Sequence, residues 1–375
     1  MNKEDLAKVR KNFKIDSERL NVRSIYNIVC GSETFTVLTE DNKYFGMLDE
    51  SLREKFILSF KKILMGNFDT NLFNLKFRND DGADYQNNLL SLRDNDLDEE
   101  EVIEFARKIV KNGAYGTEVL LTLLTATVIV PTKSQKKAKE DDDDLEGYEY
   151  DVVMCMVSKL APKTASFVLD KDNGEIKISK NMGLLDIKNP IEGFTFPSYN
   201  GGFIDVNNVL YYTSKKDEPN ELFIKNVLGC ERNITAKVQK EVFNTIIKTA
   251  VGERVDAKTL AQIYEDVKEQ GEISGDGVVS TKNITKVLVN KGFGNEEKIK
   301  EAIATTLKKD EAELSVDNIV PTKQIELKNS SISVKIKPEK LNTVVQTNSN
   351  GKRVLMIELD DNINIDELTL GAIKK

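Results

Sequence analysis

The sequence contains no histidine. Histidine is the side chain whose unperturbed pKa lies nearest neutrality, and it is the commonest general base and metal ligand. Its absence excludes Ser-His-Asp and Cys-His catalysis, histidine-containing zinc sites and the two-histidine iron triad. The remaining chemistry would depend on carboxylates with a metal, on lysine or on tyrosine. We interpret the chain as a binding or scaffolding protein rather than an enzyme, with no cofactor and no metal.

Cysteine is scarce, with only Cys30, Cys155 and Cys230. An odd, widely spaced set does not form the disulfide framework of a small secreted protein. The lack of any Cys-x-x-Cys pair also gives no support to a thiolate zinc site or a thioredoxin-like redox site. We expect each cysteine to be a small buried hydrophobe.

Long apolar runs are also missing. The longest, from Val119 to Pro131, is interrupted by threonines and falls short of the roughly 20 residues that a membrane helix needs. The opening residues, MNKEDLAKVRKNF, are charged from an early position and lack the apolar core of a signal peptide. We expect a cytoplasmic protein that neither spans a membrane nor is exported.

Basic residues are fewer than acidic residues in this chain. Among 375 residues, 54 Lys and Arg face 62 Asp and Glu, which gives a formal net charge of −8. Nucleic-acid-binding domains usually have a basic excess, because phosphates are neutralised by Lys and Arg. The acidity argues against nucleic-acid binding over the whole surface and allows a local basic patch.

The order of elements predicts an α+β fold, with N-terminal helices and an antiparallel sheet, a central helical block and a small C-terminal β unit. Residues 119–130 and 148–157 have strand character, and the charged stretch between them has little to bury. Helices do not alternate with the strands, which favours an antiparallel sheet over a doubly wound one. We predict an α+β domain over residues 1–215, with a mobile loop at 132–147.

The second half begins with amphipathic helices. Val242, Phe243 and Ile246 recur at helical spacing, and Asp256 is suited to cap the next helix. We predict a helical block over residues 216–309, an acidic connector at 309–317 and a small β unit at 318–375. The β unit is indicated by apolar residues that alternate with other types, namely Ile325, Leu327, Ile332, Val334, Ile336, Leu355, Ile357 and Leu359.

Two stretches have the residue types of a metal site. The segment Asp170–Glu175 contains the carboxylates of a calcium loop, but its Gly comes one place early and its flanks read as strands, so we favour a hairpin turn at Asn173 and Gly174. Glu175 and Lys177, with Asp170 nearby, also have the residue types of the carboxylate–lysine set of a metal-dependent nuclease. The charged face of an edge strand explains the same pattern, which recurs elsewhere in this Lys- and Glu-rich chain.

The basic residues of the C-terminal β unit form the candidate nucleic-acid-binding site. Alternation places Lys335 and Lys337 on the side opposite the apolar residues, and Lys352 and Arg353 follow the next turn. The alternative interpretation is an ordinary charged outer face of a half-buried sheet.

Several segments resemble the bacterial domain-of-unknown-function 4317 family, found mostly in low-GC Gram-positive bacteria. They are MNKEDLAKVRKNF at the start, LSLRDNDLDEEE from Leu90, GFTFPSYN and DVNNVLYY between Gly193 and Tyr212, and LGCERNITAKVQKEVFNTIIKTAVG from Leu228. The resemblance implies membership without an agreed activity. In element order, and in Leu228-Gly229 followed by AKVQ at 236–239, the chain is also distantly similar to the nucleoid-associated NdpA family.

These features lead to a first hypothesis of a non-catalytic nucleoid- or DNA-associated protein that binds DNA weakly through local basic patches. The alternative is a non-catalytic protein-interaction or regulatory module, with a protein partner and no membrane. A metal-dependent nuclease ranks third.

Overall fold

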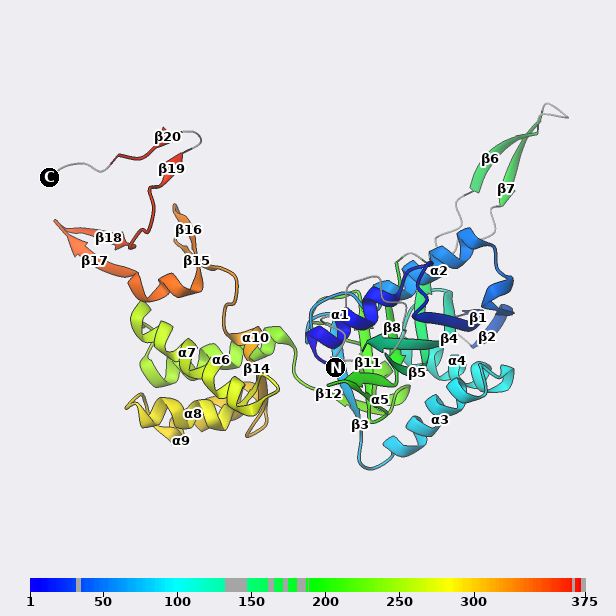
Figure 1. The fold of residues 1–375 in the computed structure, drawn as a ribbon, viewed down its shortest axis with the longest axis horizontal. Helices are drawn as coiled ribbons and strands as arrows, with labels where there is room; N and C mark the ends of the chain where they lie inside the picture. Colours follow the sequence, from blue (N-terminus) through cyan, green and yellow to red (C-terminus); the bar gives the residue numbers. More distant parts are fainter. Residues whose placement is uncertain are drawn as a thin grey trace. The chain divides into compact units, whose positions relative to one another are not determined.

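The computed structural model describes residues 1–31, 35–131, 147–160, 165–170, 175–180, 187, 189–365 and 368–371. The chain divides into two compact units, Met1–Asn233 and Ile234–Lys375, and each is described by itself (Figure 1). The loop expected at 132–147 lies outside the described residues, apart from Gly147.

The first unit is built on one antiparallel sheet of eight strands. Their order across the sheet is β12 (Cys230–Arg232), β3 (Leu72–Phe77), β11 (Asn208–Thr213), β8 (Glu192–Phe196), β5 (Gly147–Lys159), β4 (Val119–Pro131), β1 (Leu20–Gly31) and β2 (Thr36–Tyr44). Every pairing is antiparallel. Together with the helices described below, this sheet confirms the α+β class.

The β4–β5 pair is the longest ladder of the sheet, and it is the antiparallel pair that the sequence predicts. Its register runs from Val119 opposite Lys159 to Pro131 opposite Gly147. Successive side chains of a strand point to opposite faces, and residues of both parities are buried along both strands. Both faces of the sheet must therefore be covered.

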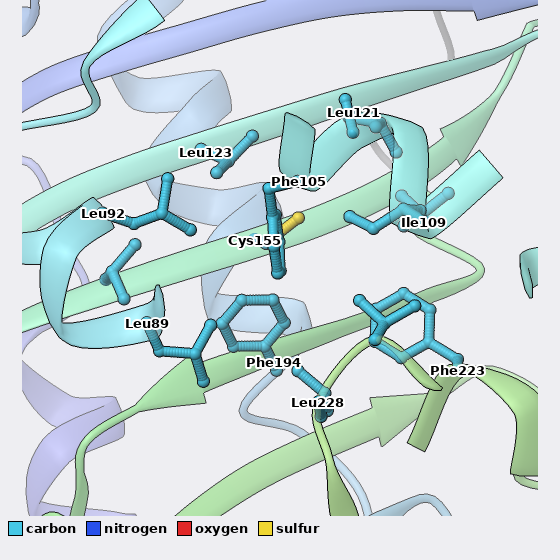
Figure 2. Close-up of a cluster of buried hydrophobic side chains, with 14 of the residues drawn as sticks. Leu89, Leu92, Phe105, Ile109, Leu121, Leu123, Cys155, Phe194, Phe223 and Leu228 are labelled. Carbon is cyan, nitrogen blue, oxygen red and sulfur yellow. The ribbon is translucent and has the colours of Figure 1, made fainter. Parts of the chain in front are cut away.

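Three helices cover one face, namely α3 (Gly82–Asp94), α4 (Glu99–Gly113) and α5 (Glu221–Asn226). Figure 2 shows the cluster where they meet the strands, with Phe105 of α4 beside Phe194 of β8. These two rings lie edge to face, with centroids 5.8 Å apart. Asp98 caps α4 by accepting from the backbone N–H groups of Glu100 and Glu101. The three cysteines are free and buried, as expected.

The other face is covered by α1 (Lys3–Asn12), the short helix η1 (Phe45–Met47) and α2 (Glu50–Lys62). Their buried apolar side chains include Leu6 and Phe13 from the α1 segment and Phe56 and Phe60 from α2. The described residues of this unit also form two hairpins, β6 (Ala165–Asp170) with β7 (Glu175–Lys180) and β9 (Ser198–Asn200) with β10 (Phe203–Asp205).

The first unit extends beyond the expected boundary at residue 215. Strand β12 pairs with β3, and the sheet therefore recruits the chain as far as Arg232. Helix α5 lies between β11 and β12 and packs on the same face as α4. Residues 216–233 thus belong with the sheet rather than with the helical block.

The second unit contains four longer helices, each capped by the side chain that precedes it. They are α6 (Ala236–Val251) after Thr235, α7 (Ala257–Ser274) after Asp256, α8 (Thr281–Asn290) after Ser280 and α9 (Glu296–Leu307) after Asn295. Asp256 therefore caps α7 as predicted. No helix within the described part of the chain is long and apolar enough to cross a membrane.

The acidic stretch 309–317 is not the connector that the sequence suggests. It contains β14 (Glu313–Ser315), which pairs with β13 (Val278–Ser280), and the start of α10 (Val316–Ile319). Leu314 is completely buried. The expectation was wrong because Leu314, together with the partly buried Ala312 and Val316, anchors this acidic segment in the helical core.

Buried Gln239 joins α6 to this segment. Its Oε1 accepts from the backbone N–H of Ser315 at 2.8 Å and from Nδ2 of Asn318 at 3.1 Å, and its Nε2 donates to the carbonyl of Ile234. A buried amide is tolerated only when its polar atoms have partners. The AKVQ motif in this helix therefore has a structural role here.

Truncating Phe243 should destabilise the second unit. The ring is completely buried and stacks on Tyr264 of α7 at a centroid distance of 6.2 Å. Phe243→Ala should cost about 3–5 kcal/mol of unfolding free energy, because it removes buried area and leaves a cavity. Denaturant unfolding of the variant measures this, with Lys237→Ala on the exposed side of the same helix as the control. A midpoint equal to that of the control would contradict the packing described here.

Candidate binding surface

The C-terminal β unit consists of three hairpins, each a separate two-stranded antiparallel sheet. They are β15 (Ile325–Lys328) with β16 (Ser333–Ile336), β17 (Val345–Ser349) with β18 (Lys352–Met356), and β19 (Asn364–Ile365) with β20 (Leu368–Thr369). The short helix η3 (Pro338–Thr343) joins the first hairpin to the second.

Asn350 and Gly351 form the two-residue turn between β17 and β18. Their φ angles are 51° and 76°, and positive values at both central positions define the type I′ turn that suits hairpin twist. The Asn-Gly sequence therefore sets the register of this hairpin, with Ser349 opposite Lys352.

The structure places the four predicted DNA-binding cations in two pairs. Lys335 lies on β16 and Lys337 directly precedes η3, whereas Lys352 and Arg353 begin β18. All four are exposed. No strand pairing between described residues joins the two hairpins, so the pairs do not share the face of one sheet.

Acidic residues offset the positive charge of this region. Between Pro321 and Ile357 the sequence has seven Lys and Arg against two Glu, but five Asp and Glu follow between positions 358 and 367. Lys335 lies directly opposite Glu326 in the ladder. Lys340 forms an ion pair with Asp360. A strong local basic field is therefore absent from this part of the described chain.

Only part of the C-terminal β unit is buried. Ile336, Leu341 and Val344 form a small core against Leu260 and Tyr264 of α7. The expectation that the other alternating apolar residues point inward was wrong for three of them, since Ile332, Leu355 and Leu359 are 58%, 41% and 56% exposed. A two-stranded hairpin has no second layer to cover it, and alternation alone cannot supply one.

Exposed apolar side chains are concentrated in this β unit. Eight of the eighteen large hydrophobic residues exposed in the described part of the chain lie between Ile332 and Leu370. They are Ile332, Val345, Leu355, Met356, Leu359, Ile363, Leu368 and Leu370. Single exposed apolar residues are ordinary, but a concentration of them marks an interaction surface.

The first unit contains a buried polar cluster that sequence reasoning missed. Glu192 lies on β8 two residues before Phe194 and therefore points to the helix-covered face of α4 and α5. One carboxylate oxygen accepts from the hydroxyl of Tyr115 at 2.6 Å, and the other accepts from that of Tyr211 at 2.7 Å. The side-chain amide of Asn220 also donates to Glu192, at 3.2 Å.

Burial dominates the electrostatics of this cluster. Burial raises the pKa of Glu192, and the three hydrogen bonds and Lys215 only partly oppose that shift. Burial next to this carboxyl raises the pKa of both Tyr115 and Tyr211. Glu192 is 4% exposed, and its hydrogen-bond partners Tyr115, Tyr211 and Asn220 all come from the same unit. Its role is to join β8, β11 and the start of α5.

Lys240 is a further ionisable group with a displaced pKa. Its Nζ lies 5.6 Å from the ring centroids of both Phe243 and Tyr264 and donates to the carbonyl oxygen of Ile319. Burial lowers its pKa. The aromatic faces and the carbonyl stabilise the ammonium form, which accounts for the residue as part of the packing between α6, α7 and α10.

The two stretches with the residue types of a metal site lie on the β6–β7 hairpin. Asp170 ends β6 and lies opposite Glu175, the first residue of β7, while residues 171–174, with the proposed turn, are outside the described residues. The part of the chain that the structure describes has no group of three or more Cys, Asp and Glu side chains able to hold a metal ion.

Two of the clefts formed by the described residues are open to solvent. One, of about 430 Å³, lies at the end of α7 and is lined by Gly271, Gly275, Gly277, Asp276 and Asp317 among others. The second, of about 250 Å³, lies between α3 and α4 and has Leu92 and Phe105 among its walls. Neither cleft has Glu192 or Lys240 among its lining residues.

The chain belongs to the domain-of-unknown-function family DUF4317, whose pattern matches residues 1–368. No curated protein and no solved structure matches it. The resemblance to this family that the sequence predicts is therefore confirmed over nearly the whole chain. The description of the family names no activity.

Replacing Glu192 should change how stability depends on pH. A carboxyl with a raised folded-state pKa stabilises the fold below its unfolded pKa, and this contribution is lost as pH rises through the folded value. Gln does not ionise, so Glu192→Gln should not lose this contribution as pH rises. The unfolding free energy of the variant should therefore increase relative to that of the wild type above about pH 4.3, the ordinary Glu pKa. Denaturant unfolding over a pH series measures this, with Glu218→Gln at an exposed position as the control. Parallel pH profiles for Glu192→Gln and the wild type would contradict a raised pKa.

Proposed function

We propose that the protein is a non-catalytic, cytoplasmic binding protein whose C-terminal β unit docks on another protein. The concentration of exposed apolar residues in three small hairpins carries the proposal. Removing such apolar area from water contributes roughly 25 cal/mol per Å². An apolar protein surface can cover these side chains in this way, whereas a charged phosphate backbone cannot.

The chemistry of the buried groups supports a non-catalytic role. Carboxylate, lysine and tyrosine chemistry were the options left by the lack of histidine. Glu192, Tyr115 and Tyr211 satisfy one another inside the first unit, and Lys240 is engaged by two rings and a carbonyl. A general acid or base must reach the substrate's proton. Glu192 and Tyr211 are 4% and 0% exposed and are therefore shielded from a substrate.

DNA association is the second candidate. Lys352 and Arg353 are exposed directly after the turn of the β17–β18 hairpin, with Asn348 and Ser349 across the ladder. A β-ribbon with such residues at its tip is a known way to enter a DNA groove. The NdpA resemblance expected from the sequence would support the same idea only by analogy, and no curated protein or solved structure matches the chain. The acidic residues from 358 to 367 weaken it.

Removing exposed apolar groups from the β unit should abolish capture of a protein partner. The double variant Leu355→Ser, Leu359→Ser removes two side chains that no core contact requires. Affinity capture from an extract of the native bacterial host, treated with nuclease, should recover a specific protein with the wild-type chain and lose it with the variant. Leu222→Ser, a similarly exposed position in the first unit, is the control and should leave recovery unchanged. Equal recovery by both variants would contradict the proposal.

A salt series tests the DNA candidate separately. If Lys335, Lys337, Lys352 and Arg353 each neutralise one phosphate, the slope of log affinity against log salt should have a magnitude of roughly 3 to 4, at about 0.9 per contact. Changing all four to Glu should remove that slope. An unchanged slope would show that other residues contact the DNA. If the wild-type chain does not bind DNA even at low salt, the DNA candidate fails and the protein-docking proposal stands.

A further inference from the structure

Strand β17 has a free edge without the usual protection against pairing. Its residues, Val345 to Ser349, include no charged residue and no proline. Edge strands usually carry charges, prolines or bulges, or are very short, because unpaired N–H and C=O groups attract strands of other chains. An uncharged edge that pairs on one side only, as β17 does in the described structure, is suited to accept a further strand.

Longer edge strands elsewhere in the described residues do have such protection, and the uncharged β9, β13, β19 and β20 are only two or three residues long. At one end of the main sheet, β2 carries Glu40, Asp41 and Lys43. At the other end, β12 is three residues long and contains Glu231 and Arg232. The neighbouring hairpin strands are charged as well, with Glu326 and Lys328 on β15, Lys335 on β16, and Lys352 and Arg353 on β18.

The turn determines which backbone groups of β17 face outward. In a hairpin with a two-residue turn, the residues flanking the turn exchange hydrogen bonds, and bonded and non-bonded pairs then alternate. Ser349, Thr347 and Val345 therefore direct their backbone groups to β18. Gln346 and Asn348 direct their N–H and C=O groups to the free edge.

The hairpin also lacks the burial that would stabilise it alone. Val345 lies opposite Met356 and Thr347 lies opposite Val354, so these four share one face. Val345 and Met356 are 48% and 51% exposed. An isolated two-stranded hairpin is marginally stable in water, whereas three or more strands with an apolar face can hold together.

We propose that β17 pairs antiparallel with β17 of a second copy of this chain, giving a four-stranded sheet β18–β17–β17–β18 about a two-fold axis. This inference rests on the proposed function and names the partner of the β unit. The axis passes beside Thr347, which lies opposite its own copy, and Gln346 lies opposite Asn348 of the second copy.

This register gives the outward backbone N–H and C=O groups of both copies a hydrogen-bond partner. It joins the outward groups of Gln346 to those of Asn348 in two bonded pairs, and the central Thr347 pair is the closely spaced, non-bonded kind. Threonine pairs are favourable neighbours across strands. The apolar faces of both hairpins lie on the same side, so Val345 and Met356 of the two copies extend one surface. The self-complementary contact closes as a dimer.

Opposite charges at Thr347 provide the test. Thr347→Glu and Thr347→Lys each place like charges next to each other across the axis, so each variant alone should dimerise at least about tenfold more weakly than the wild type. An equimolar mixture of the two should dimerise again, because Glu then faces Lys. Sedimentation of the full chain over a concentration series measures all three samples. The matched controls are Thr322→Glu and Thr322→Lys, at an exposed threonine outside the hairpins, and they should dimerise like the wild type.

Recovery in the mixture excludes misfolding as the cause of the loss. A second variant, Gln346→Pro, removes an outward N–H without removing a bond to β18 and should also weaken the dimer. A monomeric wild-type chain, a dimer that the charged variants leave unchanged, or charged variants that fail to recover when mixed would each overturn the pairing. If the chain is monomeric and still captures a host protein that Leu355→Ser, Leu359→Ser loses, the pairing fails while the proposed function stands.

Discussion

Burial of both faces of the β4–β5 ladder is the constraint on which the first unit depends. Strand β4 has no charged residue between Val119 and Pro131, and both parities of its side chains are buried. Water cannot cover either face at low cost, so helices must cover both. Helices α3, α4 and α5 cover one face, and α1 and α2 cover the other.

This closure also determines where the protein can act. The titratable cluster of Glu192, Tyr115 and Tyr211 lies within the covered layer and serves to connect strands with α5. The C-terminal hairpins face the opposite situation, because two-stranded sheets have too little area to bury their own apolar residues. The surface that the fold leaves incomplete is therefore the surface proposed for binding.

Features that depend on neighbouring residues could be predicted from the sequence. The β4–β5 strands, the cap of α7 and the buried face of α6 follow from local composition and spacing. Features that depend on distant contacts could not. Strand β12 joins the sheet through β3, far back in the chain, and the Glu192 cluster brings together residues from β8, β11 and two loops. In the candidate site, sequence alternation correctly identified a β unit with exposed cations but could not show that its strands form separate hairpins, or that Leu355 and Leu359 lack cover.

Hydrogen exchange along the whole chain tests the central claim, that the C-terminal β unit is completed by another protein surface, most directly. Backbone amides of β17 and β18 should exchange rapidly in dilute protein and become protected as chain concentration rises, because pairing occupies the free edge and covers the apolar face. Amides of β4, buried in the main sheet, serve as the internal reference and should stay protected throughout. Exchange of β17 that is independent of concentration, and also unaffected by addition of host proteins, would contradict the account.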